Sequence, residues 1–289
     1  MPTEKRQRQK EGRRARLEAE RKAAKQRQLM RRVIIVVIVA VLIVGSVYLL
    51  TRSSGNSTTT TTTTSSTTTT TIPSNAQKQA NAVAVAAGCP AEPATSAKPA
   101  NTLHWAKQPA MTINTSLPYY ATVATTAGSF KIKLNTATTP VNTNNFIFLA
   151  QHGFYNCNPF HRVIPGFMDQ TGDPTGSGSG GPGYAVSPNE FPAPKSPIQY
   201  PAGAVAMANS CPQGDTPAQC PTTNGSQFFI VAKNLSNTYL APQYTYIGQV
   251  IAGLSVVEKI NSQGNPSQAA NGVPPLVINR ILSIKITNS

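Results

Sequence analysis

The sequence lacks the patterns that usually hold a zinc ion. Its four cysteines include no C-x-x-C pair, and the three histidines, His104, His152 and His161, show no spacing typical of metal ligands. We therefore expect no metal site.

Charge is also scarce, at 12% of the residues, and it is unevenly placed. Residues 1–32 contain thirteen Lys and Arg against four Glu, so most of the net charge of +15 lies in this tail. Basic tails can bind nucleic acid, but an apolar segment follows this one directly. That context favours membrane topology and contact with anionic lipid, and we expect no nucleic-acid partner.

Residues 33–50, VIIVVIVAVLIVGSVYLL, carry no charge and no polar stripe. As a helix they would span roughly 27 Å, enough for the hydrocarbon core of a bilayer. A secretory signal peptide is the alternative, but its basic region would be unusually long and no A-x-A-like site follows closely. We expect a single-pass helix in the cell membrane, with the basic tail in the cytoplasm and the chain beyond Arg52 outside.

Residues 51–88 begin with a long Thr/Ser run that has almost nothing to bury, which predicts a disordered, flexible linker. The end of this stretch, AQKQANAVAVAAG, is compatible with a short helix of poor amphipathicity, but we assign it to the linker too. Residues 89–117 then form a segment that precedes the main domain, which we place at 118–289.

All four cysteines follow the apolar segment, on its predicted outer side. An even number of cysteines in an oxidising compartment favours disulfides. Cys211 and Cys220 stand at the two ends of one Pro-rich loop, so we pair them, which leaves Cys89 with Cys157. Free, buried thiols are the alternative.

The pattern beyond residue 117 is mainly β. Residues 119–135 predict a hairpin, in which Phe130, Ile132 and Leu134 alternate with lysines. Two helices are predicted, one that begins at Thr139 as N-cap and Pro140, and one at 254–262. Many short strands with two helices predict a closed barrel with helical caps. The further strands are expected within 227–234, 244–253 and 278–287.

The stretch FHRVIPGFMDQTGDPTGSGSGGPGY, residues 160–184, satisfies G-x-G-x-x-G with Gly176, Gly178 and Gly181. A dinucleotide loop must run directly into a helix, but Pro182 and a Pro-rich segment follow here. No G-K-[ST] step follows either. We therefore expect an irregular loop beside a site, and no nucleotide cofactor.

The same stretch contains Arg162 among apolar neighbours. Beyond residue 52 the only other arginine is Arg280, for which an outward, solvated position in a strand is a sufficient explanation. A guanidinium held among apolar groups has five fixed donors and can polarise an amide or a carboxylate. Pairing of Arg162 with Asp169 or Asp173 is the alternative, and position alone does not decide between them.

These residues resemble the signature of the cyclophilins, the peptidyl-prolyl cis-trans isomerases with an eight-stranded antiparallel barrel and two capping helices. Further motifs follow in the family's order at 203–210, 224–230 and 244–260. The resemblance covers roughly residues 118–289. It implies that Arg162 is the catalytic arginine and that the substrate is bound by Phe167, Met168, Gln170, Ala208, Asn209, Gln227, Phe229, Tyr239, Leu240 and Tyr244.

The sequence also departs from the family. Tyr239 stands where many members have Trp, and Tyr244 where many have His. Thr171 replaces a usual Gly, and Asp169 an apolar residue. The family's cyclosporin contact relies partly on that Trp, so we expect weakened inhibition by the drug.

The chemistry of prolyl isomerisation suits such a site. The X-Pro barrier of about 20 kcal/mol arises from amide resonance, so neither a nucleophile nor a metal is required. An apolar pocket for the pyrrolidine ring and a donor that stabilises the twisted amide are sufficient. With no proton to move, His161 is expected to be structural, while Trp105 is expected to pack the segment before the domain onto the barrel.

We therefore expect a membrane-anchored isomerase that assists the folding of exported or cell-surface proteins. Its partners would be proline-containing polypeptides, and its extracytoplasmic catalytic domain would be monomeric and free of cofactors. The alternative is a non-catalytic cyclophilin-like module or chaperone that binds Pro-containing segments.

Overall fold

The structure, a computed structural model, describes residues 74–191, 200–211, 219–220, 224–234, 240, 243–267 and 271–288. The predicted cytoplasmic tail, membrane helix and Thr/Ser-rich run lie outside these residues. Within the part of the chain that the structure describes, no helix combines the length and the apolar character needed to cross a bilayer.

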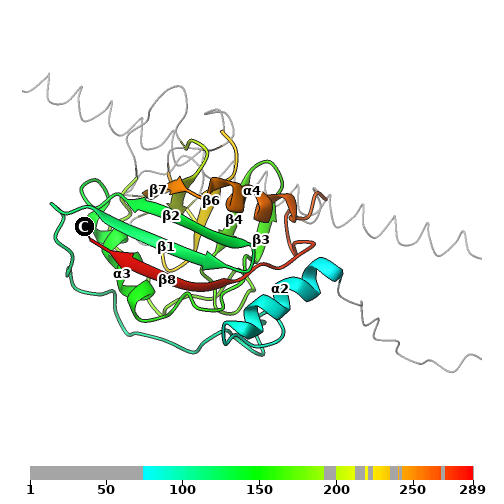
Figure 1. Ribbon diagram of the computed structural model, residues 1–289. Coiled ribbons are helices and arrows are strands. Elements are labelled where there is room, and N and C mark those ends of the chain that lie inside the picture. Colours follow the sequence, from blue (N-terminus) through cyan, green and yellow to red (C-terminus); the bar gives the residue numbers. More distant parts are fainter. Residues whose placement is uncertain are drawn as a thin grey trace, which may run out of the picture. The chain divides into compact units, whose positions relative to one another are not determined.

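In these described residues, eight strands form one antiparallel sheet with the order β3-β4-β6-β5-β7-β2-β1-β8. The sheet curls on itself (Figure 1). The strands are β1 (Tyr119–Thr125), β2 (Gly128–Leu134), β3 (Arg162–Ile164), β4 (Met168–Thr171), β5 (Ala204–Met207), β6 (Phe228–Val231), β7 (Tyr246–Ala252) and β8 (Ile281–Thr287).

The predicted hairpin is confirmed as β1 and β2, in which Tyr119 pairs with Leu134. Its alternation is confirmed as well, because Phe130, Ile132 and Leu134 are buried. The three further strands that the sequence predicts correspond to β6, β7 and β8. The main difference from the predicted closed barrel is that the described sheet has two edge strands, β3 and β8, which do not pair with each other. The segments that lead into these two strands meet only at an isolated bridge between Pro159 and Arg280.

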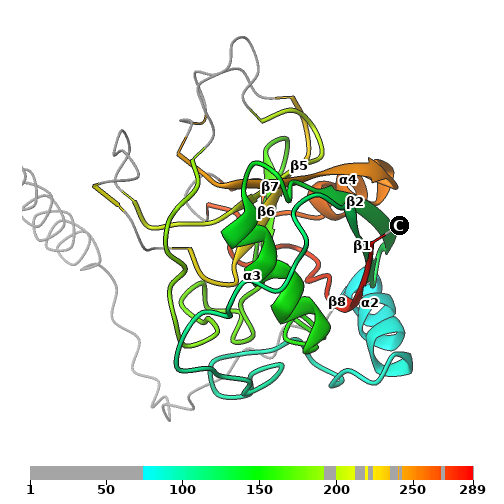
Figure 2. The ribbon, with the colours of Figure 1, turned by 90° about the vertical axis from the view of Figure 1, so that its left-hand side faces the viewer.

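Both predicted helices are present, as α3 (Pro140–Gln151) and α4 (Leu254–Ser262). They lie at opposite ends of the curled sheet (Figures 1 and 2). Each contributes to the main core inside the sheet, α3 with Phe146 and Leu149 and α4 with Val257 and Ile260. Burial of these side chains holds both helices on the sheet.

The start of α3 differs from the prediction in one detail. Thr139 occupies the N-cap position, but its side chain makes no capping hydrogen bond and donates instead to the backbone oxygen of Asn135 at 3.1 Å. The carboxylate of Glu190 takes over the cap, because it accepts the N–H groups of Val141 at 3.1 Å and Asn142 at 2.9 Å. An acid at this end of a helix satisfies free donors and suits the helix dipole.

The assignment of residues 75–86 to the linker was wrong, because they form helix α2 (Asn75–Ala86). Ala80 and Ala84 are buried. The side chain of Gln77 accepts the N–H of Ile278 at 2.7 Å, just before β8, and Figures 1 and 2 show α2 beside this strand. The buried face consists of two alanines, so the sequence gives only a weak helical pattern.

The solvated position expected for Arg280 was also wrong, since its side chain is 0% exposed. Its Nη1 donates to the backbone oxygens of Pro90 at 2.6 Å and Glu92 at 3.2 Å. Its Nη2 donates to Ala91 O at 3.3 Å and to Asn81 Oδ1 at 3.1 Å. The segment after α2 covers a strand position that the period-2 pattern marks as outward, which explains the difference.

Two disulfides join the cysteines as expected, Cys89 with Cys157 and Cys211 with Cys220. The first ties the end of α2 to the segment before β3. Further along, Trp105 packs edge-on against Phe148 of α3, with 5.3 Å between the ring centroids. Trp105 therefore packs the segment before the domain onto it, as predicted.

Candidate active site

The sheet has apolar side chains on both faces. Along β6, Phe228 and Ile230 belong to the main core, whereas Phe229 and Val231 belong to a second cluster together with Met168 of β4. The two-residue alternation of a strand produces this division. The second cluster forms the floor of a cleft.

This cleft has a volume of about 570 Å³. It brings together nine of the residues that the sequence singles out: Arg162, Phe167, Met168, Gln170, Ala208, Asn209, Phe229, Leu240 and Tyr244. A neighbouring cleft of about 320 Å³ is lined by Gln227 and shares Gln170, Ala208 and Asn209 with the first. Tyr239 lies outside the described residues.

Arg162 lies on β3 opposite Gln170 of β4. Its Nη1 donates to Gln170 Oε1 at 3.2 Å, while its Nε and Nη2 donate to Asn271 O at 3.1 Å and Asn271 Oδ1 at 2.8 Å. Among the described residues these acceptors are all amide oxygens, so the alternative that Arg162 pairs with Asp169 or Asp173 was wrong. Burial lowers the pKa of Arg162, and Tyr244 raises it.

A chain of amide hydrogen bonds continues from Gln170. Its Nε2 donates to Gln227 Oε1 at 3.0 Å. The Nε2 of Gln227 in turn donates to the backbone oxygens of Gly178 at 2.9 Å and Gly180 at 3.0 Å. These hydrogen bonds fix the side chains of Gln170 and Gln227, which lie between the two clefts, against the glycine-rich loop.

That loop lies beside the site, as the sequence predicts, and Asp173 holds its conformation. The carboxylate accepts the N–H groups of Thr175 at 2.7 Å, Gly178 at 2.6 Å and Gly180 at 3.1 Å. Burial raises the pKa of Asp173, but hydrogen bonds from Thr175 and Gly180 outweigh it, so the pKa is lowered. The backbone N–H groups of this loop therefore bind the carboxylate of Asp173, rather than a nucleotide phosphate.

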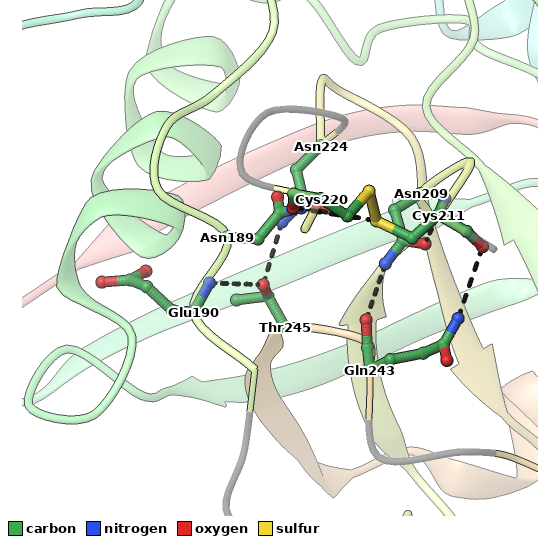
Figure 3. Close-up of a disulfide and its surroundings, with 8 residues drawn as sticks. All are labelled: Asn189, Glu190, Asn209, Cys211, Cys220, Asn224, Gln243 and Thr245. Atoms are coloured by element: carbon green, nitrogen blue, oxygen red, sulfur yellow. Dashed lines mark hydrogen bonds between the residues drawn. A yellow bond between two sulfur atoms is a disulfide. The ribbon is translucent and has the colours of Figure 1, made fainter. Parts of the chain in front are cut away.

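The far wall of the cleft is held by the second disulfide (Figure 3). Asn209 Nδ2 donates to Gln243 O at 2.7 Å, and Asn209 Oδ1 accepts the N–H of Cys211 at 3.1 Å. On the other side of the bridge, Cys220 O accepts from Asn189 Nδ2 at 2.6 Å. Asn209 is thus fixed beside a covalent cross-link.

Tyr244, at the position where the family often has His, is part of the aromatic wall. Its ring meets that of Phe229 edge-on, with centroids 5.2 Å apart. Its backbone N–H donates to the hydroxyl of Tyr200 at 2.9 Å, and that hydroxyl donates to Tyr244 O at 2.9 Å. Burial raises the pKa of Tyr244, and nearby Arg162 lowers it, so Tyr244 stays neutral and apolar contact is its main contribution.

His161 lines the cleft but is only 6% exposed. Burial lowers its pKa, partly offset by Asp173. The neutral imidazole suits the structural role expected for it. In the described part of the chain, no three His, Cys, Asp or Glu side chains gather in a way that could hold a metal ion.

Sequence reasoning missed two residues of the cleft, Asn271 and Val273. Both follow α4, more than one hundred residues after Arg162 in the chain. The dipeptide Asn271-Gly272 is a common turn signal, and Asn271 indeed has a positive φ of 48°. Nothing in the local sequence indicates that this turn meets β3.

The fold and the site define a domain that can bind an apolar group next to a fixed cationic donor. Residues 120–285 match the family model described as cyclophilin type peptidyl-prolyl cis-trans isomerase/CLD. This match covers more than half of the chain, so the chain belongs to that family. The enzyme class expected from the sequence is confirmed at the level of the family.

Individual relatives agree. The chain is 38% identical over 167 residues to a probable peptidyl-prolyl cis-trans isomerase B of Mycobacterium leprae, which covers 53% of this chain and 52% of the relative. It is 39% identical over 147 residues to a peptidyl-prolyl cis-trans isomerase-like 1 of Aspergillus fumigatus, with 49% and 84% covered. The chain thus spans about half the length of the mycobacterial relative.

A crystal structure of a cyclophilin type peptidyl-prolyl cis-trans isomerase of Cryptosporidium parvum is similar in fold. The TM-score is 0.50 at 28% sequence identity, and the alignment covers 60% of this chain and 99% of the other. The expected cyclophilin-like architecture is confirmed as an eight-stranded curled antiparallel sheet with helices.

Proposed function

We propose that this protein accelerates the cis–trans isomerisation of X-Pro bonds in polypeptides. One observation carries the proposal. Arg162, fixed by three hydrogen bonds, borders the same cleft as the apolar side chains of Met168 and Phe229.

The cleft supplies what the reaction needs. Resonance gives the X-Pro amide a barrier of about 20 kcal/mol, and twisting the bond localises the lone pair on nitrogen. Met168, Phe229 and Leu240, each less than 10% exposed, form an apolar floor for the pyrrolidine ring. The guanidinium of Arg162 donates to the prolyl carbonyl oxygen or to the nitrogen. Such a donor contributes a few kcal/mol when the bond strengthens in the transition state.

The test is the exchange rate between cis and trans forms of an Ala-Pro-containing peptide, measured by NMR with catalytic amounts of the full-length protein in mild detergent. The wild type is expected to accelerate exchange, and Arg162→Ala to reduce kcat by about 100-fold. A wild-type rate equal to that of the free peptide would exclude catalysis, and a rate equal to that of Arg162→Ala would exclude the catalytic role of Arg162. Binding of the peptide without acceleration would then favour the non-catalytic module.

We also propose that the domain acts outside the cell membrane on exported or cell-surface proteins, tethered by residues 33–50. The support is the uncharged run of these residues, the basic tail before it and the cysteines after it. In intact cells, external protease should remove the domain while the tail stays protected, and carbonate should leave the protein in the membrane fraction. Recovery of the full chain in the soluble fraction would refute the anchor.

A further inference from the structure

Asn271 contributes two acceptors to one edge of the Arg162 guanidinium. Its backbone oxygen accepts from Nε at 3.1 Å, and its side-chain Oδ1 accepts from Nη2 at 2.8 Å. A two-point contact of this kind fixes the plane of the guanidinium, which a single hydrogen bond does not. Gln170 holds the third nitrogen, Nη1, at 3.2 Å.

The turn that carries Asn271 is itself fixed to the strand that carries Arg162. The N–H of Val163 donates to Gly272 O at 3.0 Å. A Cβ at Gly272 would come within 2.6 Å of Val163 O, so only glycine permits this approach. Asn271 itself has a φ of 48°, a conformation that Asn tolerates better than most residues. The two acceptors are therefore held in register with β3.

The acceptors have a further property in common. Both oxygens of Asn271, like that of Gln170, belong to neutral amides. They orient the guanidinium, and no carboxylate of the described residues pairs its charge. Within the described part of the chain, three of the five N–H groups of this arginine are used in this way, which leaves two for a bound peptide.

We propose that Asn271 is a positioning residue for prolyl isomerisation. It fixes the guanidinium of Arg162 in the orientation that the twisted amide requires, and its neutrality keeps the positive charge available to the substrate. This inference rests on the proposed function. Asn271 acts through Arg162, so its effect should appear in the chemical step and disappear when Arg162 is absent.

The main test is Asn271→Gly. Glycine adopts a positive φ without steric cost and keeps the backbone acceptor, so of the two acceptors this variant removes only Oδ1. We expect kcat to fall about tenfold, because the guanidinium is less well oriented, while KM changes less than twofold and the melting temperature does not fall. Unchanged kcat, or a rise in KM alone, would overturn the proposal.

Asn265→Gly is the matched control, because Asn265 is a half-buried residue that follows α4 and donates to Pro274 O rather than contacting Arg162. It is expected to keep the wild-type kcat. A fall equal to that of Asn271→Gly would mean that loosening of the loop, rather than loss of the acceptor, causes the effect.

A double-mutant cycle tests the route of action. In an Arg162→Ala background, Asn271→Gly is expected to change kcat less than twofold, since the group it positions is gone. A full tenfold loss in that background would show that Asn271 acts independently of Arg162 and would overturn the proposal.

Asn271→Asp tests neutrality. The carboxylate keeps an acceptor in place but pairs the charge of Arg162, so kcat is expected to fall about tenfold although the arginine stays held. A wild-type kcat in this variant would overturn the neutrality argument.

A readout independent of catalysis separates this inference from the proposed function. Rotation of the Nη2 group of Arg162, followed by side-chain NMR, is expected to be slower in the wild type than in Asn271→Gly. If the wild type does not catalyse exchange at all, the proposed function fails. The NMR comparison still decides whether Asn271 holds Arg162, and equal rotation rates would refute that.

Discussion

Arg280 donates from its Nη2 to Oδ1 of Asn81 at 3.1 Å, across 199 residues of sequence. The contact joins the start of β8 to α2, and it makes the segment around Glu92 part of the folded domain. The guanidinium of Arg280 is fully buried and donates to three backbone carbonyl oxygens of this segment. Removal of such a group leaves several buried acceptors without a donor.

We therefore predict that Arg280→Leu lowers the free energy of unfolding by about 3 kcal/mol. Urea denaturation followed by circular dichroism measures this. Lys285→Ala, an exposed change on the same strand, serves as control and should alter the stability by less than about 0.5 kcal/mol. If the two variants are equally stable, the buried arginine does not hold the N-terminal segment.

The disulfide between Cys89 and Cys157 closes a loop over a sequence separation of 68. Chain entropy then predicts that it stabilises the protein by about 4 kcal/mol. The double variant Cys89→Ser/Cys157→Ser should lose most of this in urea denaturation. Its kcat below the unfolding transition should stay near that of the wild type, since neither cysteine lines the cleft of Arg162.

Local patterns predicted the parts of this fold that depend on local physics. Alternation identified β1 and β2, and Pro140 marked the start of α3. Burial of Arg280 and helix α2 could not be predicted in the same way, because each depends on the other's surface. A position that the alternation of a strand marks as solvent-exposed is exposed in the fold only if no other segment of the chain packs over it.

The residues of the candidate site also fall into those that the sequence predicts and those that only the tertiary structure brings in. Arg162 and Gln170 stand close together in sequence, in a motif that resembles a known family, so both were predicted. Asn271 meets Arg162 only through tertiary structure. Position alone left open whether Arg162 is catalytic or ion-paired, the resemblance implied the catalytic role, and among the described residues the geometry shows no ion pair with Asp169 or Asp173.

The disulfide between Cys211 and Cys220 should behave differently from the first. Its sequence separation is 9, so the entropic contribution is smaller, about 2.5 kcal/mol. It fixes Asn209, however, through the N–H of Cys211 (Figure 3). We predict that Cys211→Ser/Cys220→Ser raises KM for a prolyl peptide several-fold and changes kcat little.

The variant Cys89→Ser/Cys157→Ser is the matched control for this experiment, because it also removes one disulfide but is expected to change a different property. Loss of Cys89–Cys157 should appear in stability, and loss of Cys211–Cys220 mainly in KM. If both variants change KM equally, the link from the second disulfide to Asn209 does not contribute to substrate binding.

Asp169 should make stability depend on pH. Its carboxyl group is fully buried on β4, and burial raises its pKa from 3.8 to about 8, while a hydrogen bond from Asn261 lowers it. At a pH between these two pKa values, the carboxyl group of Asp169 is protonated in the folded state and ionised in the unfolded state. The protonated carboxyl therefore contributes its full stabilisation below the pKa of the unfolded state, and this contribution is lost as the pH rises through the pKa of the folded state.

The free energy of unfolding of the wild type should therefore fall by roughly 1 kcal/mol per pH unit between pH 5 and 8, relative to Asp169→Asn. The variant keeps an acceptor for Asn261 and cannot ionise. The lowered pKa of buried His161 gives a slope of opposite sign below about pH 6.5, but it is present in both proteins and cancels in the difference. Urea denaturation at several pH values measures the two curves. Parallel curves would mean that Asp169 is ionised in the folded state, with solvent or a further donor at its second oxygen.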